Sequence, residues 1–470
     1  MPGVEHNATT ASQKAFEINM DNARYGTFSE IGAGQEVARW FFRVGGAAGT
    51  VAKSISAYDM EVSDTIYGEC KRYVSRQRLL QMLEREFSLL QERLGNSRGE
   101  QSHFFSFADT VAAKSYRRKN DAHGWLGVRF QHKTGAKASQ IIIHTRLLDP
   151  ENVQQQEALG IIGVNLVYGA LYQWKDPAAV IKGLRDDLNR ERVEIDMIEF
   201  SGAVFKKTDN RLMALQLVQQ GHTSAAMFLA NGKVVQPAEV LYKKCILVER
   251  GSFRPVTNAT IDLLESATAM FVQEPQVQDK DIEVLTEMTL NNLTTGNTID
   301  HIDFLQRVDI LGALGKNVLI SNFGEFHRLA AYLFRYTKNM IGISIGIPTL
   351  NEIFNEEYYT NLDGGILESF GRLFKNELRL YVYPWKHPKT DTLVTAGNFR
   401  VESHLRHLYA YLAENHYIQG IRGYNEDCLP IFPRKILELI SNGESGWEEM
   451  VPPKVAEIIK ERKLFNYDAE

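Results

Sequence analysis

Cysteine is scarce in this sequence: Cys70, Cys245 and Cys428 are the only three among 470 residues. They lie far apart, and no Cys-x-x-Cys pair occurs. This pattern excludes a disulfide scaffold and a cysteine-based zinc site, and it favours a reducing compartment. The 12 histidines show no His-x-His or His-Glu-x-x-His spacing, so we predict no metal site. The sequence does not identify a cofactor.

A hydrophobic run long enough to span a membrane is also absent. The longest apolar stretch, residues 158–172, holds about fifteen residues and includes Asn165, whereas a transmembrane helix needs about 20. Residues 1–14 are polar and lack the apolar core of a secretory signal. We therefore predict a cytoplasmic protein that does not enter a membrane.

The net charge is small, with 53 basic and 58 acidic residues and a formal charge of −5. A mildly acidic balance is not typical of a general nucleic-acid or membrane binder. Residues 101–148 depart from this average, because they hold eight basic and two acidic residues. The basic face that we expect there contains Arg117, Arg118, Lys119 and Arg129.

Aromatic residues alternate with basic residues in segment 101–148. One interpretation is a platform that stacks single-stranded nucleic acid or a nucleotide. The other, which we favour, is that alternate strand positions bury the rings and expose the basic side chains. Nucleic acid is therefore not the partner that we expect. The surplus charge still suits an acidic ligand or the acidic face of another subunit.

The hydrophobic periodicity predicts an α/β fold, with an N-terminal helical and antiparallel-strand portion and a C-terminal, mostly parallel, doubly wound sheet. Residues 1–20 resemble a loose polar leader, and residues 73–94 have the spacing of an amphipathic helix. Three strand-like segments, at 103–113, 124–131 and 141–148, predict an antiparallel meander.

Beyond residue 281, strand-like and helix-like segments alternate. Such repeated β-α units predict parallel strands joined by right-handed crossovers. The polar segment 273–281 contains Pro275 and favours a domain boundary. We therefore expect three portions of the chain: residues 1–100, 101–274 and 281–470.

Polar residues follow the predicted strands of the last third, where an open parallel sheet binds its ligands. We assign acid-base chemistry to Glu287, Glu325 and His327, and ligand binding to Ser321, Asn322 and Lys386. The alternative is that these residues only fill polar loops and cap helices, as Ser321 and Asn322 could do before Glu325.

Two segments could offer backbone N–H groups to an anion. Asp363, Gly364 and Gly365 precede a predicted helix and suit a phosphate or carboxylate, although an ordinary capped turn explains them too. Residues 32–50 are glycine-rich, but Val37 stands where a dinucleotide fingerprint needs its third glycine. Residues 27–31 also make a poor buried strand. Close helix packing or a loop hinge is therefore the simpler role for segment 32–50.

Residues 25–42 and 318–350 contain the stretches YGTFSEIGAGQEVARWFF and VLISNFGEFHRLAAYLFRYTKNMIGISIGIPTL. Together with the overall layout, they resemble an uncharacterised family of bacterial proteins of about this length, over nearly the whole chain. Members of that family carry labels such as nicotinate-nucleotide adenylyltransferase, a transferase, or TonB-related protein. The His-x-Gly-His signature of such adenylyltransferases is absent, and the nearest feature is Gly324-Glu325-Phe326-His327. The resemblance therefore transfers no catalytic residue.

Three functional hypotheses follow from these patterns. The first is an enzyme or binding protein for a nucleotide or another phosphorylated or anionic metabolite, with an unknown reaction. The second is a non-catalytic protein that assembles into homo-oligomers or filaments through its charge asymmetry. The third and weaker one is RNA binding by residues 101–148.

Overall fold

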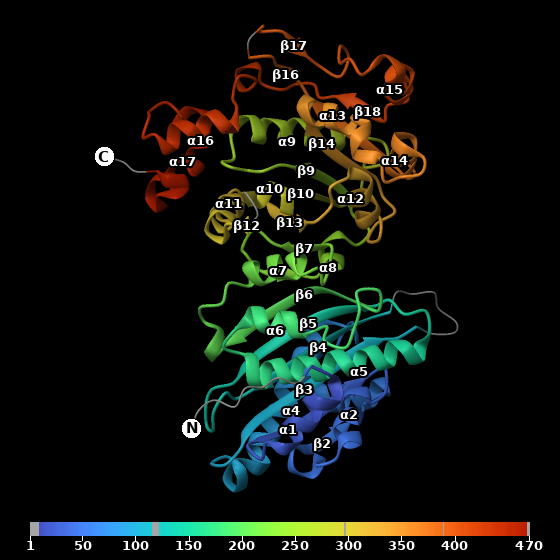
Figure 1. The fold of residues 1–470 in the computed structure, drawn as a ribbon, viewed down its shortest axis with the longest axis vertical. Helices are drawn as coiled ribbons and strands as arrows, with labels where there is room; N and C mark the ends of the chain where they lie inside the picture. Colours follow the sequence, from blue (N-terminus) through green and yellow to red (C-terminus); the bar gives the residue numbers. More distant parts are fainter. Residues whose placement is uncertain (1–8, 115–121, 296–297, 389, 468–470) are drawn as a thin grey trace. The chain divides into compact units, whose positions relative to one another are not determined.

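The computed structural model describes residues 9–114, 122–295, 298–388 and 390–467 (Figure 1). The chain divides into two compact units, Met1–Ser224 and Ala225–Glu470. This differs from the three portions that the sequence suggested, because strands on either side of each expected boundary pair within one sheet. Arg24–Ile31 pairs with His103–Ala112 across residue 100, and Cys245–Arg250 pairs with Ile282–Thr289 across the segment containing Pro275.

The first unit is built on a mixed sheet. Its strands are β1 (Arg24–Ile31), β2 (Val51–Ile55), β3 (His103–Ala112), β4 (His123–Phe130), β5 (Ser139–Leu147) and β6 (Val193–Gly202). Their order is β2-β1-β3-β4-β5-β6. The β1 strand runs parallel to β2 and β3, and each later pair is antiparallel. The structure thus confirms the antiparallel meander that we predicted for β3, β4 and β5.

Helices cover both faces of this sheet. They are α1 (Ala11–Met20), α2 (Glu36–Val44), α3 (Met60–Tyr67), α4 (Arg76–Arg98), α5 (Asn152–Tyr168), α6 (Pro177–Gly183) and α7 (Asn210–Gln219). Phe107 of β3 is buried in one core with Val37 of α2 and Ile162 of α5. Its neighbour Ser106 points to the opposite face, where its Oγ donates to the carbonyl oxygen of Leu83 in α4 at 3.1 Å.

Two expectations for the N-terminal region were wrong. Residues 11–20 of the expected polar leader form α1, which begins with a reciprocal capping box between Thr10 and Gln13. Residues 27–31 belong to β1, and they are buried despite Ser29 and Glu30. The Ser29 hydroxyl lies 2.6 Å from the hydroxyl of Tyr67, and the Glu30 carboxylate accepts two N–H groups of α2 at 2.9 Å. Buried polar groups are tolerated when they are hydrogen-bonded in this way.

The glycine-rich segment 32–50 begins with a close backbone approach. Gly32 has a φ of +104°, and a Cβ placed there would lie 1.9 Å from the carbonyl oxygen of Val111 in β3. Only glycine fits this position, which supports the close-packing interpretation at this residue.

The second unit is built on a larger sheet of mostly parallel strands. These are β7 (Ala225–Phe228), β8 (Val234–Val235), β9 (Cys245–Arg250), β10 (Ile282–Thr289), β13 (Asn317–Ser321), β14 (Ile341–Gly346), β15 (Leu378–Tyr383) and β18 (Ile418–Gly420). Their order is β18-β15-β14-β9-β10-β13-β7-β8, and only β7 and β8 are antiparallel to their neighbours. Two short hairpins pair β11 (Thr294–Thr295) with β12 (Thr298–Ile299), and β16 (Trp385–Lys386) with β17 (Leu393–Val394).

The helices of the second unit are wound on both faces of its sheet. They are α8 (Pro237–Leu241), α9 (Asn258–Phe271), α10 (Leu290–Leu293), α11 (His301–Ala313), α12 (Phe326–Leu333), α13 (Ile347–Ile353), α14 (Gly365–Leu373), α15 (Arg406–Glu414), α16 (Pro433–Ser441) and α17 (Pro453–Arg462). Residues of α12, α13 and α14 share a core with Ile246 and Val248 of β9. The alternate residues Cys245 and Leu247 pack with α9. This confirms the doubly wound sheet.

The winding direction of the second sheet changes between β9 and β14. The chain moves outward from β9 through β10 to β13, returns to β14 beside β9, and continues outward through β15 to β18. In such sheets the loops after the two central strands diverge and leave a crevice. Among the described residues, no helix has the length and apolar character needed to cross a bilayer.

Candidate functional site

A crevice of about 210 Å³ lies at the carboxyl ends of β9 and β14, where the winding reverses. Its polar lining comes from Glu249 at the end of β9 and from Thr257 and Thr260 at the start of α9. Gly346 closes it from the end of β14. Tyr383, Pro384 and Trp385, which end β15 and follow it, line the same crevice. Three neighbouring strands of the sheet therefore contribute residues to the lining of one cavity.

Glu249 is a buried carboxyl group in the lining of this crevice. Only 5% of the residue is exposed, and its Oε2 atom is buried without a hydrogen-bond partner in the described structure. It is in register with Thr286 of β10 and Ser344 of β14. Burial raises the pKa of Glu249 to about 8, and the positive charge of Lys316 offsets only part of that effect. The carboxyl is therefore protonated at neutral pH and can donate a hydrogen bond.

The N-terminus of α9 forms a polar edge of the crevice. Thr257 caps the helix by accepting the N–H of Thr260 at 3.2 Å. The first N–H groups of an α-helix have no acceptor within it, and here they belong to Asn258 and Ala259. Such groups, together with the helix dipole, attract an anion.

The rest of the lining is apolar and rigid. Ile347 and Pro348 begin α13, and Phe432 and Pro433 begin α16. The hydroxyl of Tyr383 donates to the carboxylate of Asp262 at 2.5 Å, which fixes the ring. This combination of flat apolar surfaces and a few polar groups is typical of a small-molecule site.

Sequence reasoning missed Glu249 because of the expected domain boundary. Residues Cys245–Arg250 form β9, but the expected boundary at residue 274 separates this strand from the last third of the chain. The site residues that we predict from strand ends all lie beyond residue 281. The signal for Glu249 and Arg250 is their position at the end of a strand that precedes a helix.

Two predicted residues, Glu287 and Ser321, meet at the same sheet edge but on the opposite face. The Glu287 carboxylate is fully buried, and Arg250 donates to its two oxygens at 2.7 and 2.9 Å. The Ser321 hydroxyl donates to Glu287 Oε1 at 2.5 Å. Arg250 also donates to the carbonyl oxygen of Gly324 at 3.0 Å. These groups hold β9, β10 and β13 together, and Asn322 beside them is exposed.

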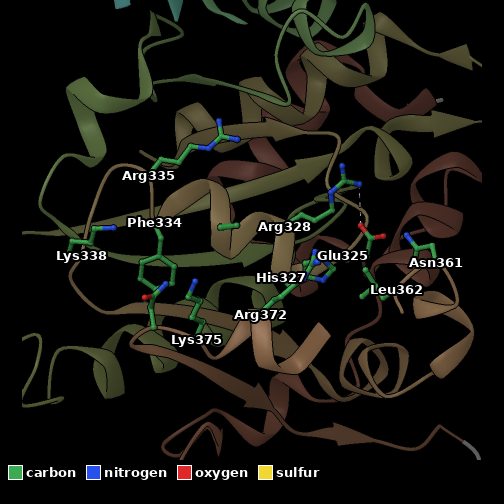
Figure 2. A pocket seen from close by; sticks show the side chains of 12 residues that line it. Glu325, His327, Arg328, Phe334, Arg335, Lys338, Asn361, Leu362, Arg372 and Lys375 are labelled. Carbon is green, nitrogen blue, oxygen red and sulfur yellow. Dashed lines mark ion pairs between the residues drawn. The ribbon is translucent and has the colours of Figure 1, made fainter. Parts of the chain in front are cut away.

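Glu325 and His327 line a different cavity, a cleft between α12 and α14 (Figure 2). His327 is 5% exposed, and its Nδ1 lies 3.2 Å from the Ser369 hydroxyl. Burial lowers the pKa of His327. Glu325 forms an ion pair with Arg328 at 3.5 Å. The structure thus separates these two residues from Glu287.

The other predicted ligand-binding groups have partners within the chain. The N–H of Gly364 donates to the Glu368 carboxylate at 2.8 Å, and the N–H of Gly365 donates to the carbonyl oxygen of Leu362 at 3.0 Å. Asp363 is exposed. Lys386 follows Trp385 of the crevice, and its ammonium pairs with Asp391 at 2.9 Å.

The predicted basic face is only partly visible, because Arg117, Arg118 and Lys119 lie outside the described residues. Arg129 pairs with Glu84 at 2.8 Å and lies over the ring of Phe87. The aromatic side chains that the structure describes in this segment are buried: Phe104, Phe105, Phe107, Trp125 and Phe130. Those rings pack in the core, as the favoured interpretation expected. Within the described ranges, no three His, Cys, Asp or Glu side chains are placed to hold a metal ion.

Part of the chain is similar to solved structures of bacterial competence/damage-inducible proteins. No family model and no curated protein matches the chain. A competence/damage-inducible protein from Agrobacterium tumefaciens is 15% identical, with 36% of this chain and 99% of that chain covered and a TM-score of 0.25. A CinA-superfamily protein from Enterobacter cloacae is 12% identical, with 36% of this chain and 96% of that chain covered and a TM-score of 0.26. A CinA-superfamily protein from Escherichia coli is 13% identical, with 39% of this chain and 95% of that chain covered and a TM-score of 0.24. Similarity at this level carries no argument about function.

Proposed function

We propose that the second unit binds a nucleotide, or another phosphorylated metabolite with a flat ring, in the crevice between β9 and β14. One observation carries the proposal: the unpartnered carboxyl of Glu249 faces a cavity at the point where a doubly wound sheet reverses its direction. Ligands of such sheets bind in that position. A buried polar atom without a partner is costly unless a ligand or water supplies one.

The size and lining of the crevice define the class of ligand. Its volume of about 210 Å³ is below the roughly 300 Å³ at which sites for drug-sized molecules begin. The enclosed part therefore accepts a ring and its immediate substituents, and not a whole nucleotide. Trp385, Pro348 and Phe432 offer flat surfaces for that ring. A phosphoryl group would then lie at the polar edge, where the N–H groups of Asn258 and Ala259 begin α9.

Glu249 is the group at this site that can exchange a proton near neutral pH. With its pKa near 8, it donates a hydrogen bond to a ring nitrogen or a sugar hydroxyl in its protonated form. It accepts a proton once it is ionised. If the bound ligand reacts, we assign the acid-base role to Glu249 in place of Glu287, whose carboxylate is held by Arg250.

The test is calorimetric titration of the full-length protein with adenosine, AMP and ATP, and with the corresponding guanine and cytosine compounds. A Gly346→Leu variant fills the crevice, since a Cβ at Gly346 meets nothing closer than Pro348 Cδ at 3.5 Å. We expect saturable binding of at least one nucleotide and a loss of at least tenfold in affinity in this variant.

The matched control is Gly397→Leu, where a Cβ meets only Thr395 Oγ1 at 3.7 Å, away from the crevice. It should bind the same nucleotide as tightly as the wild type does. The proposal fails if no compound of the panel binds, or if Gly346→Leu binds as well as the control. The self-assembly and RNA-binding hypotheses stay predictions.

A further inference from the structure

The cleft between α12 and α14 is a second cavity in the same unit, with a volume of about 780 Å³. Figure 2 shows its lining side chains. Five of them are cationic and only one, Glu325, is a carboxylate. The cations are Arg328, Arg335, Lys338, Arg372 and Lys375.

The two helices that form the walls of the cleft pack against each other. His327 of α12 is buried against Ser369 of α14 through a contact of 3.2 Å between Nδ1 and Oγ. Leu329, Leu333, Ile366 and Phe370 of the same two helices belong to one buried core. Arg328 and Arg372 therefore project from packed helices, which reduces the entropy that a ligand must overcome to order them. The other three cations follow the C-terminal ends of these helices.

The positive charge of this cleft is only partly neutralised. Arg328 pairs with Glu325 at 3.5 Å, and Arg372 pairs with Glu368 at 2.5 Å. Lys338 and Lys375 are exposed, and no residue in the part of the chain that the structure describes forms an ion pair with either of them. Like charges gathered in a concave site raise the local potential and attract anions.

These features define the anion. The volume lies within the range of about 300–1,000 Å³ for small-molecule sites. Cations outnumber the one carboxylate in the lining even though Glu368 pairs with Arg372, so the cleft suits a ligand with more than one negative charge. Arginine forks favour phosphoryl oxygens, which they contact in a bidentate manner. Glu325 lies beside its ion-pair partner Arg328 in Figure 2, and its negative charge disfavours a long chain of phosphates. Asn361 and Asn376 add neutral hydrogen-bonding groups.

We propose that the cleft between α12 and α14 binds a small polyphosphate compound, one with two or more linked phosphoryl groups, as a site separate from the β9–β14 crevice. The ring of such a compound is not needed for recognition, because the cleft selects by charge. Inorganic tripolyphosphate is therefore the appropriate probe.

The experiment is calorimetric titration of the full-length protein with tripolyphosphate and with orthophosphate, at 50 and at 200 mM salt. We expect one saturable site for tripolyphosphate, at least tenfold weaker binding of orthophosphate, and a clear loss of affinity at the higher salt concentration. Lys338→Gln/Lys375→Gln should weaken tripolyphosphate binding at least tenfold. This variant breaks no ion pair that the structure describes, so it should fold like the wild type.

The matched control is Lys206→Gln/Lys207→Gln, which removes two exposed lysines from the first unit. It changes the net charge equally and should bind tripolyphosphate normally. Equal weakening in the two double variants, or no saturable binding at all, would overturn the proposal. A single-stranded oligonucleotide that displaces tripolyphosphate at lower concentration than ATP does would assign the cleft to nucleic acid instead. Gly346→Leu should leave tripolyphosphate binding unchanged, which separates this proposal from that for the crevice.

Discussion

Replacing Glu249 with glutamine should change how the stability of the second unit depends on pH. Burial raises the pKa of Glu249 from 4.5 to about 8. In the unfolded chain the carboxyl ionises at its ordinary pKa, while in the folded chain it stays protonated up to about pH 8. The folded state therefore binds more protons than the unfolded state in this interval, and stability falls as the pH rises.

The magnitude follows from the size of the pKa difference. Each unit corresponds to about 1.4 kcal/mol, so the full loss of stability between pH 4.5 and 8 amounts to roughly 4–5 kcal/mol. Between pH 6 and 8 the loss is about 2–3 kcal/mol. Glu249→Gln keeps the shape of the neutral carboxyl and cannot ionise. Relative to the wild type, this variant should thus gain about 2–3 kcal/mol between pH 6 and 8.

The assay is pulse proteolysis in urea at the two pH values, with the surviving fragments identified by mass. This readout follows the second unit separately from the first, since each has its own core. The control is Glu265→Gln on the exposed side of α9, which should stay within about 0.5 kcal/mol of the wild type at both values. If the difference between Glu249→Gln and the wild type is the same at pH 6 and pH 8, Glu249 is not the buried, protonated group described above.

Two further predictions concern packing and charge inside the units. Arg250→Met should lower the free energy of unfolding by about 3–5 kcal/mol, because it leaves Glu287 as an unpaired buried charge. Arg250→Met/Glu287→Leu should recover most of that loss, as measured by urea unfolding. Gly163→Ala should destabilise the first unit by about 1–3 kcal/mol, because a Cβ there would lie 2.2 Å from Val37 Cγ2. Gly371→Ala, at an open helical position, should instead increase thermal stability slightly.

The sequence predicts most of the helices and strands, but it predicts few of the pairings between strands that lie far apart along the chain. The β-α alternation after residue 281 is visible because each segment carries its own hydrophobic period. The pairing of β9 with β14 joins residues about 95 positions apart along the chain, and no local pattern encodes it. The segment around Pro275 illustrates the difference. Its composition resembles a linker between domains, yet it joins α9 to β10 within one sheet.

The same limit explains which candidate residues the sequence could identify. The sequence predicts that Glu287 follows a strand, and the structure places it inside β10, two residues before the end of that strand. The availability of Glu287 for chemistry is a different matter, since that depends on Arg250 from a neighbouring strand. Ser29 and Glu30 show the converse. Their polarity argued against a buried strand, and only Tyr67 and α2, which come later in the chain, make their burial possible.

The two sites that we propose in the second unit differ in how they would bind a ligand. In the crevice, a neutral Glu249 and apolar walls favour a ring by shape and by a few hydrogen bonds, which salt hardly affects. In the cleft, the cations favour a ligand by charge. Salt weakens such an interaction, because the Debye length is only about 10 Å at 0.1 M ionic strength. A nucleoside polyphosphate contains both features. Salt should therefore weaken binding of tripolyphosphate far more than binding of adenosine.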